Sequence, residues 1–388
     1  MEANCGHAVG RVFAAKVSDE DYYERVVYTV SDIEIPDKTY WCGVPLSDGR
    51  VILPSHYESK IGVLNLATGA YNDVTGPGPC AYRSGVLLRD GRVVLVPYSA
   101  GTIGIFDSAT NAYSEIAIGA PMSGTYIGGV VLNDGRVLFV PYTARTIGIF
   151  DPVTDSYSTI PGLPGRCAYR GGVLMLDGRV LFVPWNSATI GIFNPTTNEY
   201  KEIPCNITYS AGMMPSSAYS GGVLLADGRV LLVPHNATTI TIFNPETYTS
   251  VYYTVTCKTE YYAEHFGGVL LPDGRVVFVP GRTMTIGIFN PDTGVYSTIP
   301  CGSEEMPLAE YYAFNGACVL PDGRIAFIPW NTKNVWFVTL SDEKARARTR
   351  LRTEAVKEDL IAAAWHPKRM TAWCLDTDER RELAEMCG

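Results

Sequence analysis

The side chains best suited to chemistry in this sequence are aromatic residues and histidines that recur at matching points of a repeated pattern. One set follows the proline that closes an apolar run: Tyr98, Tyr142, Trp185, His235 and Trp330. A second set stands just before another apolar run: Tyr40, Tyr82, Tyr126, Tyr169, Tyr219, His265 and Phe314. Rings gathered on one surface bind sugars or flat ligands by stacking. A position that recurs in nearly every unit is also expected where neighbouring units pack together, and packing is the commoner reason.

Two histidines interrupt these aromatic sets. His235 and His265 belong to adjoining units and can face each other, with Tyr261 or Tyr262 nearby. Imidazole suits copper or zinc, but two histidines without an evident third ligand make a weak metal site. We therefore predict no metal, no cofactor and no catalytic residue. The candidate ligand-binding residues are Tyr98, Tyr142, Trp185, His235, His265 and Trp330.

These residues belong to a unit that recurs about every 45 residues. The copy from Phe266 to Pro300 holds four short runs rich in Val, Ile and Phe, each closed by Gly, Pro, Asp or Asn, which is typical of strands and turns. Seven copies carry the triplet Asp-Gly-Arg, which begins at Asp48, Asp90, Asp134, Asp177, Asp227, Asp273 and Asp322. Asp-Gly suits a two-residue hairpin turn, and the Arg is expected to reach a carboxylate or carbonyl of an adjacent unit. The pattern predicts an all-β fold, a seven-bladed propeller with four-stranded antiparallel blades.

The seventh unit lacks a fourth run, because a charged stretch begins at Ser341. A matching run lies at the other end of the chain, where residues 26–36 end in Ile-Pro as the fourth runs of other units do. We therefore predict that this N-terminal strand completes the last blade and removes an exposed edge. The predicted divisions are an N-terminal extension (1–25), a propeller (26–340) and an α-helical tail (341–388).

The run GGVLLPDGRVVFVP followed by IFNPDTGVY resembles a kelch-type propeller repeat, over roughly residues 26–340. Two features depart from that family. Val-Pro stands where kelch repeats usually carry a Gly pair, and tyrosines such as Tyr113 replace the usual Trp of the fourth strand. The resemblance implies the blade geometry but no particular kelch subfamily. Copper-radical oxidases also use a kelch-like propeller and bind copper through Tyr and His, so an oxidase-like enzyme is an alternative.

The tail changes to a helical spacing of apolar residues. It carries enough apolar surface to dock either on the propeller itself or on another protein, but it is too short to fold a core alone. Trp and Met are favoured interface anchors, so the candidate partner-binding residues are Trp365, Met370, Trp373 and Leu375. Residues 363–388 resemble a C-terminal segment of proteins from large DNA viruses of protists. That resemblance implies capsid or other virion components as partners, bound through the C-terminal helices.

Composition limits the partners and the compartment. The net charge of −9 argues against nucleic acid binding, because phosphate neutralisation by cationic groups supplies most of that affinity. No apolar run approaches the ~20 residues that a membrane helix needs. The N-terminus lacks the basic lead and unbroken apolar core of a secretory signal. We therefore predict no membrane span and an intracellular site of synthesis, and the viral resemblance implies the host-cell cytoplasm and also the virion.

Two classes of function remain. The first is a non-enzymatic scaffold for protein–protein interaction, a structural or virion-associated protein of a large DNA virus. It is favoured because the sequence holds no complete acid/base or metal constellation. The second is a glycan-binding protein or a copper-radical oxidase-like enzyme that uses the aromatic face of the channel.

Overall fold

A computed structural model describes residues 12–14, 26–35, 40–55, 58–119, 124–163, 168–210, 216–255, 265–271, 273–281, 285–300, 313–320, 323–330, 332 and 334–340. Every regular element within these residues is a β-strand. No helix long and apolar enough to cross a membrane occurs among them. The tail, with its candidate residues Trp365, Met370, Trp373 and Leu375, lies outside the described residues, as do Tyr261 and Tyr262.

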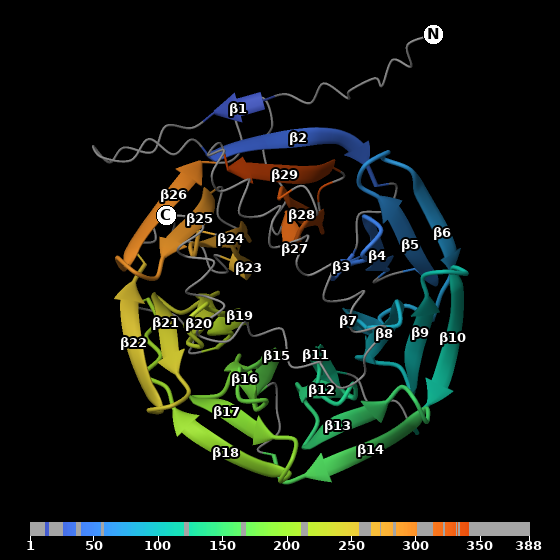
Figure 1. The fold of residues 1–388 in the computed structure, drawn as a ribbon, viewed down its shortest axis with the longest axis horizontal. Helices are drawn as coiled ribbons and strands as arrows, with labels where there is room; N and C mark the ends of the chain where they lie inside the picture. Colours follow the sequence, from blue (N-terminus) through green and yellow to red (C-terminus); the bar gives the residue numbers. More distant parts are fainter. Residues whose placement is uncertain are drawn as a thin grey trace, which may run out of the picture.

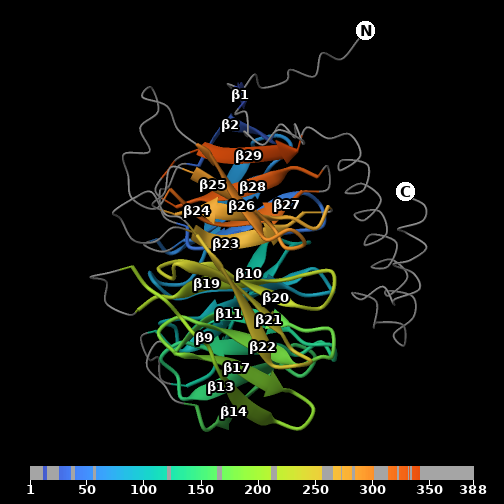
Figure 2. The same cartoon turned by 90° about the vertical axis from the view of Figure 1, so that its left-hand side faces the viewer.

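The strands form seven antiparallel sheets arranged as blades around a central axis (Figure 1), and Figure 2 shows the same ring from its edge. Blades 1 to 3 contain β3 (Val44–Pro45), β4 (Arg50–Pro54), β5 (Lys60–Asn65) and β6 (Tyr71–Thr75); β7 (Tyr82–Leu87), β8 (Arg92–Pro97), β9 (Thr102–Asp107) and β10 (Ala112–Ala117); and β11 (Tyr126–Val131), β12 (Val137–Pro141), β13 (Thr146–Asp151) and β14 (Ser156–Pro161). Blades 4 to 6 contain β15 (Tyr169–Leu174), β16 (Val180–Pro184), β17 (Thr189–Asn194) and β18 (Glu199–Pro204); β19 (Tyr219–Leu224), β20 (Val230–Pro234), β21 (Thr239–Asn244) and β22 (Thr249–Thr254); and β23 (His265–Leu270), β24 (Val276–Pro280), β25 (Thr285–Asn290) and β26 (Val295–Pro300). The predicted seven-bladed propeller is confirmed.

Blade 7 joins the two ends of the propeller. It contains β27 (Phe314–Val319), β28 (Ile325–Pro329), β29 (Asn334–Leu340) and the N-terminal β2 (Val26–Glu34). β2 pairs antiparallel with β29, with Val26 opposite Leu340 (Figure 1). The N-terminal strand thus supplies the fourth strand that the seventh unit lacks. A fifth strand, β1 (Val12–Ala14), pairs with the outer edge of β2 and was not predicted from the sequence.

The hydrophobic core is divided among the interfaces between blades. Seven apolar clusters of described residues each draw on two neighbouring blades. Second strands such as β12 are buried along their whole length, whereas the outermost strand β14 alternates between half-buried and exposed positions. A blade therefore buries its faces only against its neighbours, which makes the closed ring a condition of stability.

The Asp-Gly-Arg turns, which join the first and second strands of each blade, contact the neighbouring blade. In blade 2, Gly91 donates its N–H to the carbonyl of Leu88 and has φ +88°, so the loop has three residues and ends in a left-handed glycine. The predicted two-residue loop is therefore wrong by one residue. Arg92 forms an ion pair with Asp90 at 2.7 Å and donates to the carbonyl of Pro152 in blade 3 at 2.9 Å. The expectation that the arginine reaches a carbonyl of the adjacent blade is confirmed for Arg50, Arg92 and Arg179.

Candidate functional site

A β-bulge near the start of the first strand shapes the face of the central channel in blades 2 to 7. The first strands lie nearest the axis (Figure 1), and in blade 4 the pairing with β16 shifts register between Tyr169 and Gly172. Gly171 within this bulge has φ +85°, and a Cβ added to it would stand 3.6 Å from the Cα of Gly221 in blade 5. Neighbouring first strands therefore approach backbone to backbone. A bulge re-aims the side chain beside it, here that of Arg170.

The residue at this point of each blade, which directly precedes a glycine in blades 3 to 7, varies around the ring. Around the ring it is Trp41, Arg83, Ile127, Arg170, Ser220, Phe266 and Asn315. The residue after the second-strand proline varies as well, being Ser55, Tyr98, Tyr142, Trp185, His235, Gly281 and Trp330. These two positions break a repeat that is otherwise nearly constant, so they give the channel face a surface specific to this chain.

The recurring aromatic residue that directly precedes Trp41, Arg83 and their counterparts has a structural role. Tyr40, Tyr82, Tyr126, Tyr169, Tyr219, His265 and Phe314 are all at most 2% exposed. Each lies against a third- or fourth-strand side chain of its own blade; for example, the hydroxyls of Tyr126 and Tyr157 lie 2.7 Å apart. The packing interpretation holds for this set, and it does not line the channel.

His265 belongs to that buried layer and not to the channel face. Its Nε2 lies 3.1 Å from the hydroxyl of Tyr296, and its ring packs 5.1 Å from that of Phe278. Burial lowers the pKa of His265 to about 3. The two histidines do not present their rings to each other, because His235 contacts the backbone carbonyl of His265 and not its imidazole.

The other five predicted ligand-binding residues join a continuous group of side chains that we call the channel-face cluster. It comprises Trp41, Arg83, Tyr98, Tyr142, Arg170, Trp185, His235, Phe266 and Trp330. Ring centroids are 4.7 Å apart for Trp41 and Trp330, 5.5 Å for Trp330 and Phe266, and 4.6 Å for Phe266 and His235. His235 lies 4.8 Å from Trp185, and Tyr98 lies 6.3 Å from Tyr142. The cluster spans blades 1, 2, 3, 4, 5, 6 and 7.

Two arginines are stacked within this cluster. The guanidinium carbon of Arg83 lies 3.8 Å from the ring centroid of Trp41 and 3.6 Å from that of Tyr98. That of Arg170 lies 4.6 Å from Trp185 and 5.1 Å from Phe266. Arginine over an aromatic face is stabilised by the ring quadrupole. Both cations are thereby held in fixed positions at the channel.

His235 is the one titratable base of the cluster. Its Nδ1 donates a hydrogen bond of 3.0 Å to the carbonyl of His265, which fixes the tautomer and leaves Nε2 as an acceptor. Burial, and then the charge of Arg170, lower the pKa of His235 to about 3. His235 is therefore neutral at physiological pH. Among the described residues, no group of three or more His, Cys, Asp or Glu side chains is placed to hold a metal ion.

Sequence reasoning missed four members of the cluster: Trp41, Arg83, Arg170 and Phe266. The signal was present, because these residues stand directly after the recurring aromatic, at a position whose identity varies around the ring. If side chains alternate strictly along a regular strand, these residues are assigned to the face of the sheet opposite to the one they occupy. The bulge that corrects the assignment is marked by the following glycine in most blades.

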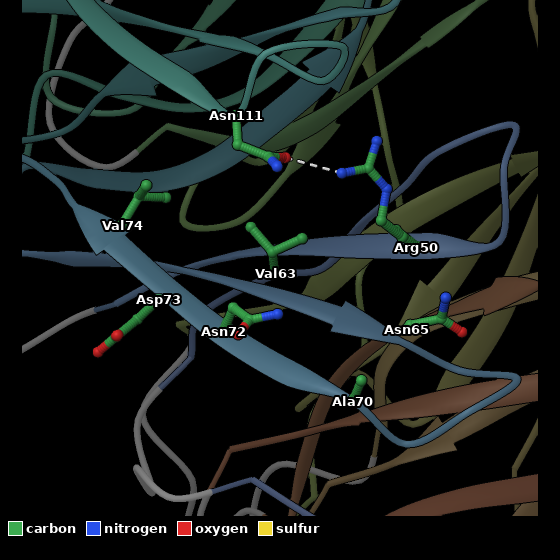
Figure 3. Close-up of a pocket in the computed structure, with 8 residues that line it drawn as sticks. All are labelled: Arg50, Val63, Asn65, Ala70, Asn72, Asp73, Val74 and Asn111. Atoms are coloured by element: carbon green, nitrogen blue, oxygen red, sulfur yellow. Dashed lines mark hydrogen bonds between the residues drawn. The ribbon is translucent and has the colours of Figure 1, made fainter.

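A separate pocket of about 320 Å³ lies at the outer part of blades 1 and 2 (Figure 3). Its charged side chains are already engaged. Arg50 donates to the Oδ1 of Asn111 at 2.7 Å and to the carbonyl of Ser108 at 2.6 Å, and Asp73 pairs with Lys60 at 3.0 Å. The pocket therefore belongs to the contacts that join the two blades.

Comparison with known proteins supports the fold alone. No family model matches the sequence, and no curated protein matches it. Many solved structures share the fold. A streptogramin B lyase is 18% identical with a TM-score of 0.65, covering 81% of this chain and 98% of its own. A catalytically inactive histidine-to-alanine variant of virginiamycin B lyase from Staphylococcus aureus with quinupristin is 16% identical with a TM-score of 0.66, covering 81% and 99%. Hydrazine synthase from Kuenenia stuttgartiensis is 13% identical with a TM-score of 0.60, covering 80% and 98%.

Proposed function

We propose that this chain is a non-enzymatic binding propeller, a rigid scaffold that holds a ligand or a partner at the channel-face cluster. The observation that carries the proposal is the concentration of aromatic rings and stacked arginines at the two positions where the repeat varies. A frame that is constant elsewhere gives such a cluster a fixed geometry. Preorganised rings and cations lose little conformational entropy when a ligand binds.

An enzyme is the second candidate, because His235 presents an acceptor nitrogen within the cluster and two of the similar folds are lyases. The pKa of about 3 makes His235 a poor general base at neutral pH, since general bases work best with a pKa near the working pH. The described members of the cluster include no carboxylate that would raise that pKa. A copper-radical oxidase is disfavoured further, because His265 is turned into its own blade.

The biological setting is a further part of the proposal. We place the protein in the host-cell cytoplasm and in the particles of a large DNA virus, where the tail joins it to capsid or other virion proteins. This part is supported by the sequence of residues 363–388, and the kelch-like assignment is supported by the repeat. Mass spectrometry of purified particles tests it. Absence of the chain from particles, with abundant chain in the infected cytoplasm, would contradict a virion role.

One experiment distinguishes a binding function from an enzymatic one. Calorimetric titration of the full chain with a panel of oligosaccharides should give heat of binding, and mass spectrometry of the same mixtures should recover each sugar unchanged. Trp330→Ala should abolish the binding, because Trp330 links Trp41 to Phe266 within the cluster. Time-dependent product that disappears in His235→Ala would replace the binding function by an enzymatic one.

A further inference from the structure

The arginines of the Asp-Gly-Arg turns are paired with the carboxylate of their own turn. In six Asp-Gly-Arg turns the structure describes both the arginine and the aspartate. In each of the six, the two side chains form an ion pair at 2.6 to 2.7 Å. Arg83 differs from these arginines. It forms no ion pair among the described residues, and its Nε is buried without a hydrogen-bond partner there. A partly buried cation without a counter-charge is costly, so an external anion is the group that would complete it.

The stacking of Arg83 determines how an anion approaches. Its guanidinium carbon lies within 3.8 Å of two ring centroids, those of Trp41 and Tyr98, so rings occupy the space over the guanidinium. Arginine presents its N–H donors as a planar fork that matches a carboxylate bidentately. Burial lowers the pKa of Arg83, but the guanidinium remains charged at any physiological pH. Because Nε is buried, the site is suited to one planar anionic group that meets the Nη1 and Nη2 edge of the fork.

The rings beside Arg83 indicate what carries that anion. Trp41, Trp330 and Phe266 follow one another as an arc, and Arg170 lies over Phe266 at the end of the arc away from Arg83. Planes of neighbouring rings are tilted by 45° and 88°, and the centroids are close enough for the rings to touch. A flat base does not fit between rings that touch. Sugar rings can instead pack their apolar faces on successive aromatic surfaces.

The charge of the whole molecule limits the number of anionic groups. The net charge is −9, so a polyanion such as nucleic acid is repelled strongly, while a ligand with one or two carboxylates is repelled much less. From these observations we infer that the channel-face cluster binds an acidic oligosaccharide, with a sugar carboxylate on Arg83 and sugar rings on the arc of Trp41, Trp330 and Phe266. This inference rests on the proposed binding function and names the ligand class.

The test uses the full chain and calorimetric titration with digalacturonic acid, its methyl ester, sialyllactose and lactose. At least one acidic sugar should bind, and its neutral counterpart should bind at least ~10-fold more weakly, because it lacks the charge-assisted hydrogen bonds. Arg83→Gln should weaken acid binding by a similar factor. Arg83→Lys should also weaken it, because lysine has no planar fork. Equal melting temperatures establish that the variants fold.

Arg89→Gln is the matched control. Arg89 lies in the turn at the opposite end of β7, so this variant removes the same charge from the same blade without touching the cluster. It should bind acidic sugars as the unchanged chain does. The inference is overturned if acid and ester bind equally, if Arg83→Gln binds normally, or if neither acidic sugar binds at millimolar concentration, whether or not adenosine monophosphate binds. Neutral sugars that bind equally well and are lost in Trp330→Ala would preserve the proposed function alone.

Discussion

A compensating pair of substitutions in blade 2 tests how the buried aromatic layer is built. In blade 2 the third-strand glycine, Gly104, leaves room for two tyrosines, because a Cβ added there would stand 2.8 Å from a ring carbon of Tyr82 and 3.0 Å from one of Tyr113. Blade 5 fills the corresponding space with different side chains. It has Thr241 and Ser250 at the corresponding positions, and the Thr241 hydroxyl lies 2.6 Å from that of Tyr219.

We expect Gly104→Thr alone to cost about 1–3 kcal/mol through overpacking. Tyr113→Ser alone should cost about 3 kcal/mol, because it removes a half-buried ring and leaves a cavity. The double variant copies blade 5: the serine makes room for the threonine, whose hydroxyl can reach Tyr82. It should therefore be more stable than the sum of the single effects predicts, by at least ~1 kcal/mol.

Urea unfolding of the four proteins, followed by circular dichroism, measures this coupling. Ser114→Thr, a β-branched substitution on the exposed side of β10, serves as the control and should change stability by less than about 0.5 kcal/mol. A double variant that is as unstable as the two single losses added together would refute the packing argument. The tyrosine pair would then stabilise the blade through its hydrogen bond and not through the space that the glycine leaves.

Three further predictions concern the histidine of the buried layer and the two ends of the chain. Burial lowers the pKa of His235 and of His265 to about 3, whereas a histidine in the unfolded chain has a pKa near 6.5. The free energy of unfolding should therefore be highest above about pH 6.5. Between about pH 6.5 and pH 3 it should fall by about 1.4 kcal/mol per pH unit for each histidine. His265→Tyr, which restores the tyrosine of other blades, should halve this slope in urea titrations between about pH 6.5 and 5. Deleting residues 1–36 should lower the melting temperature markedly, because it removes β2 from β29; an unchanged value would exclude closure by β2. Deleting residues 341–388 should leave the melting temperature nearly unchanged and abolish co-purification with the partner, whereas earlier unfolding would assign the tail to the propeller.

The fold could be predicted because its signals are local and are repeated seven times. Short Val- and Ile-rich runs closed by Asp-Gly-Arg identify strands and turns. A run at residues 26–36, which matches the fourth run of the repeat but precedes the first unit, identifies the closing strand. The three-residue loop at Gly91 was missed, because Asp-Gly is compatible with both hairpin lengths and only the backbone pairing decides between them. β1 was missed because three residues are too few to show a period.

The site could be predicted only in part, because a β-bulge changes which side chains share a face. Tyr98 and Trp185 follow the second strand, where no bulge intervenes, and they remain candidate ligand-binding residues within the channel-face cluster. Arg83 and Arg170 lie in bulges, and alternation along a regular strand puts them on the face opposite to the one they occupy. His265 was placed on the channel face because it interrupts a recurring tyrosine. Its true neighbours come from other strands of its blade, which a single sequence does not reveal.

Departures from the repeat therefore need a second criterion before they indicate function. His265 departs from the recurring tyrosine, but Tyr296 of the same blade meets its Nε2, so that departure is accommodated inside the blade. Thr241 departs from the recurring glycine and is matched by Tyr219 in the same way. Arg83 departs from its counterparts with no carboxylate in its own blade to balance its charge, and the rings that hold it include Trp41 of blade 1. A departure that the blade does not compensate costs stability unless something outside the chain meets it. For that reason Arg83, and not either buried histidine, is where we expect the ligand to be recognised.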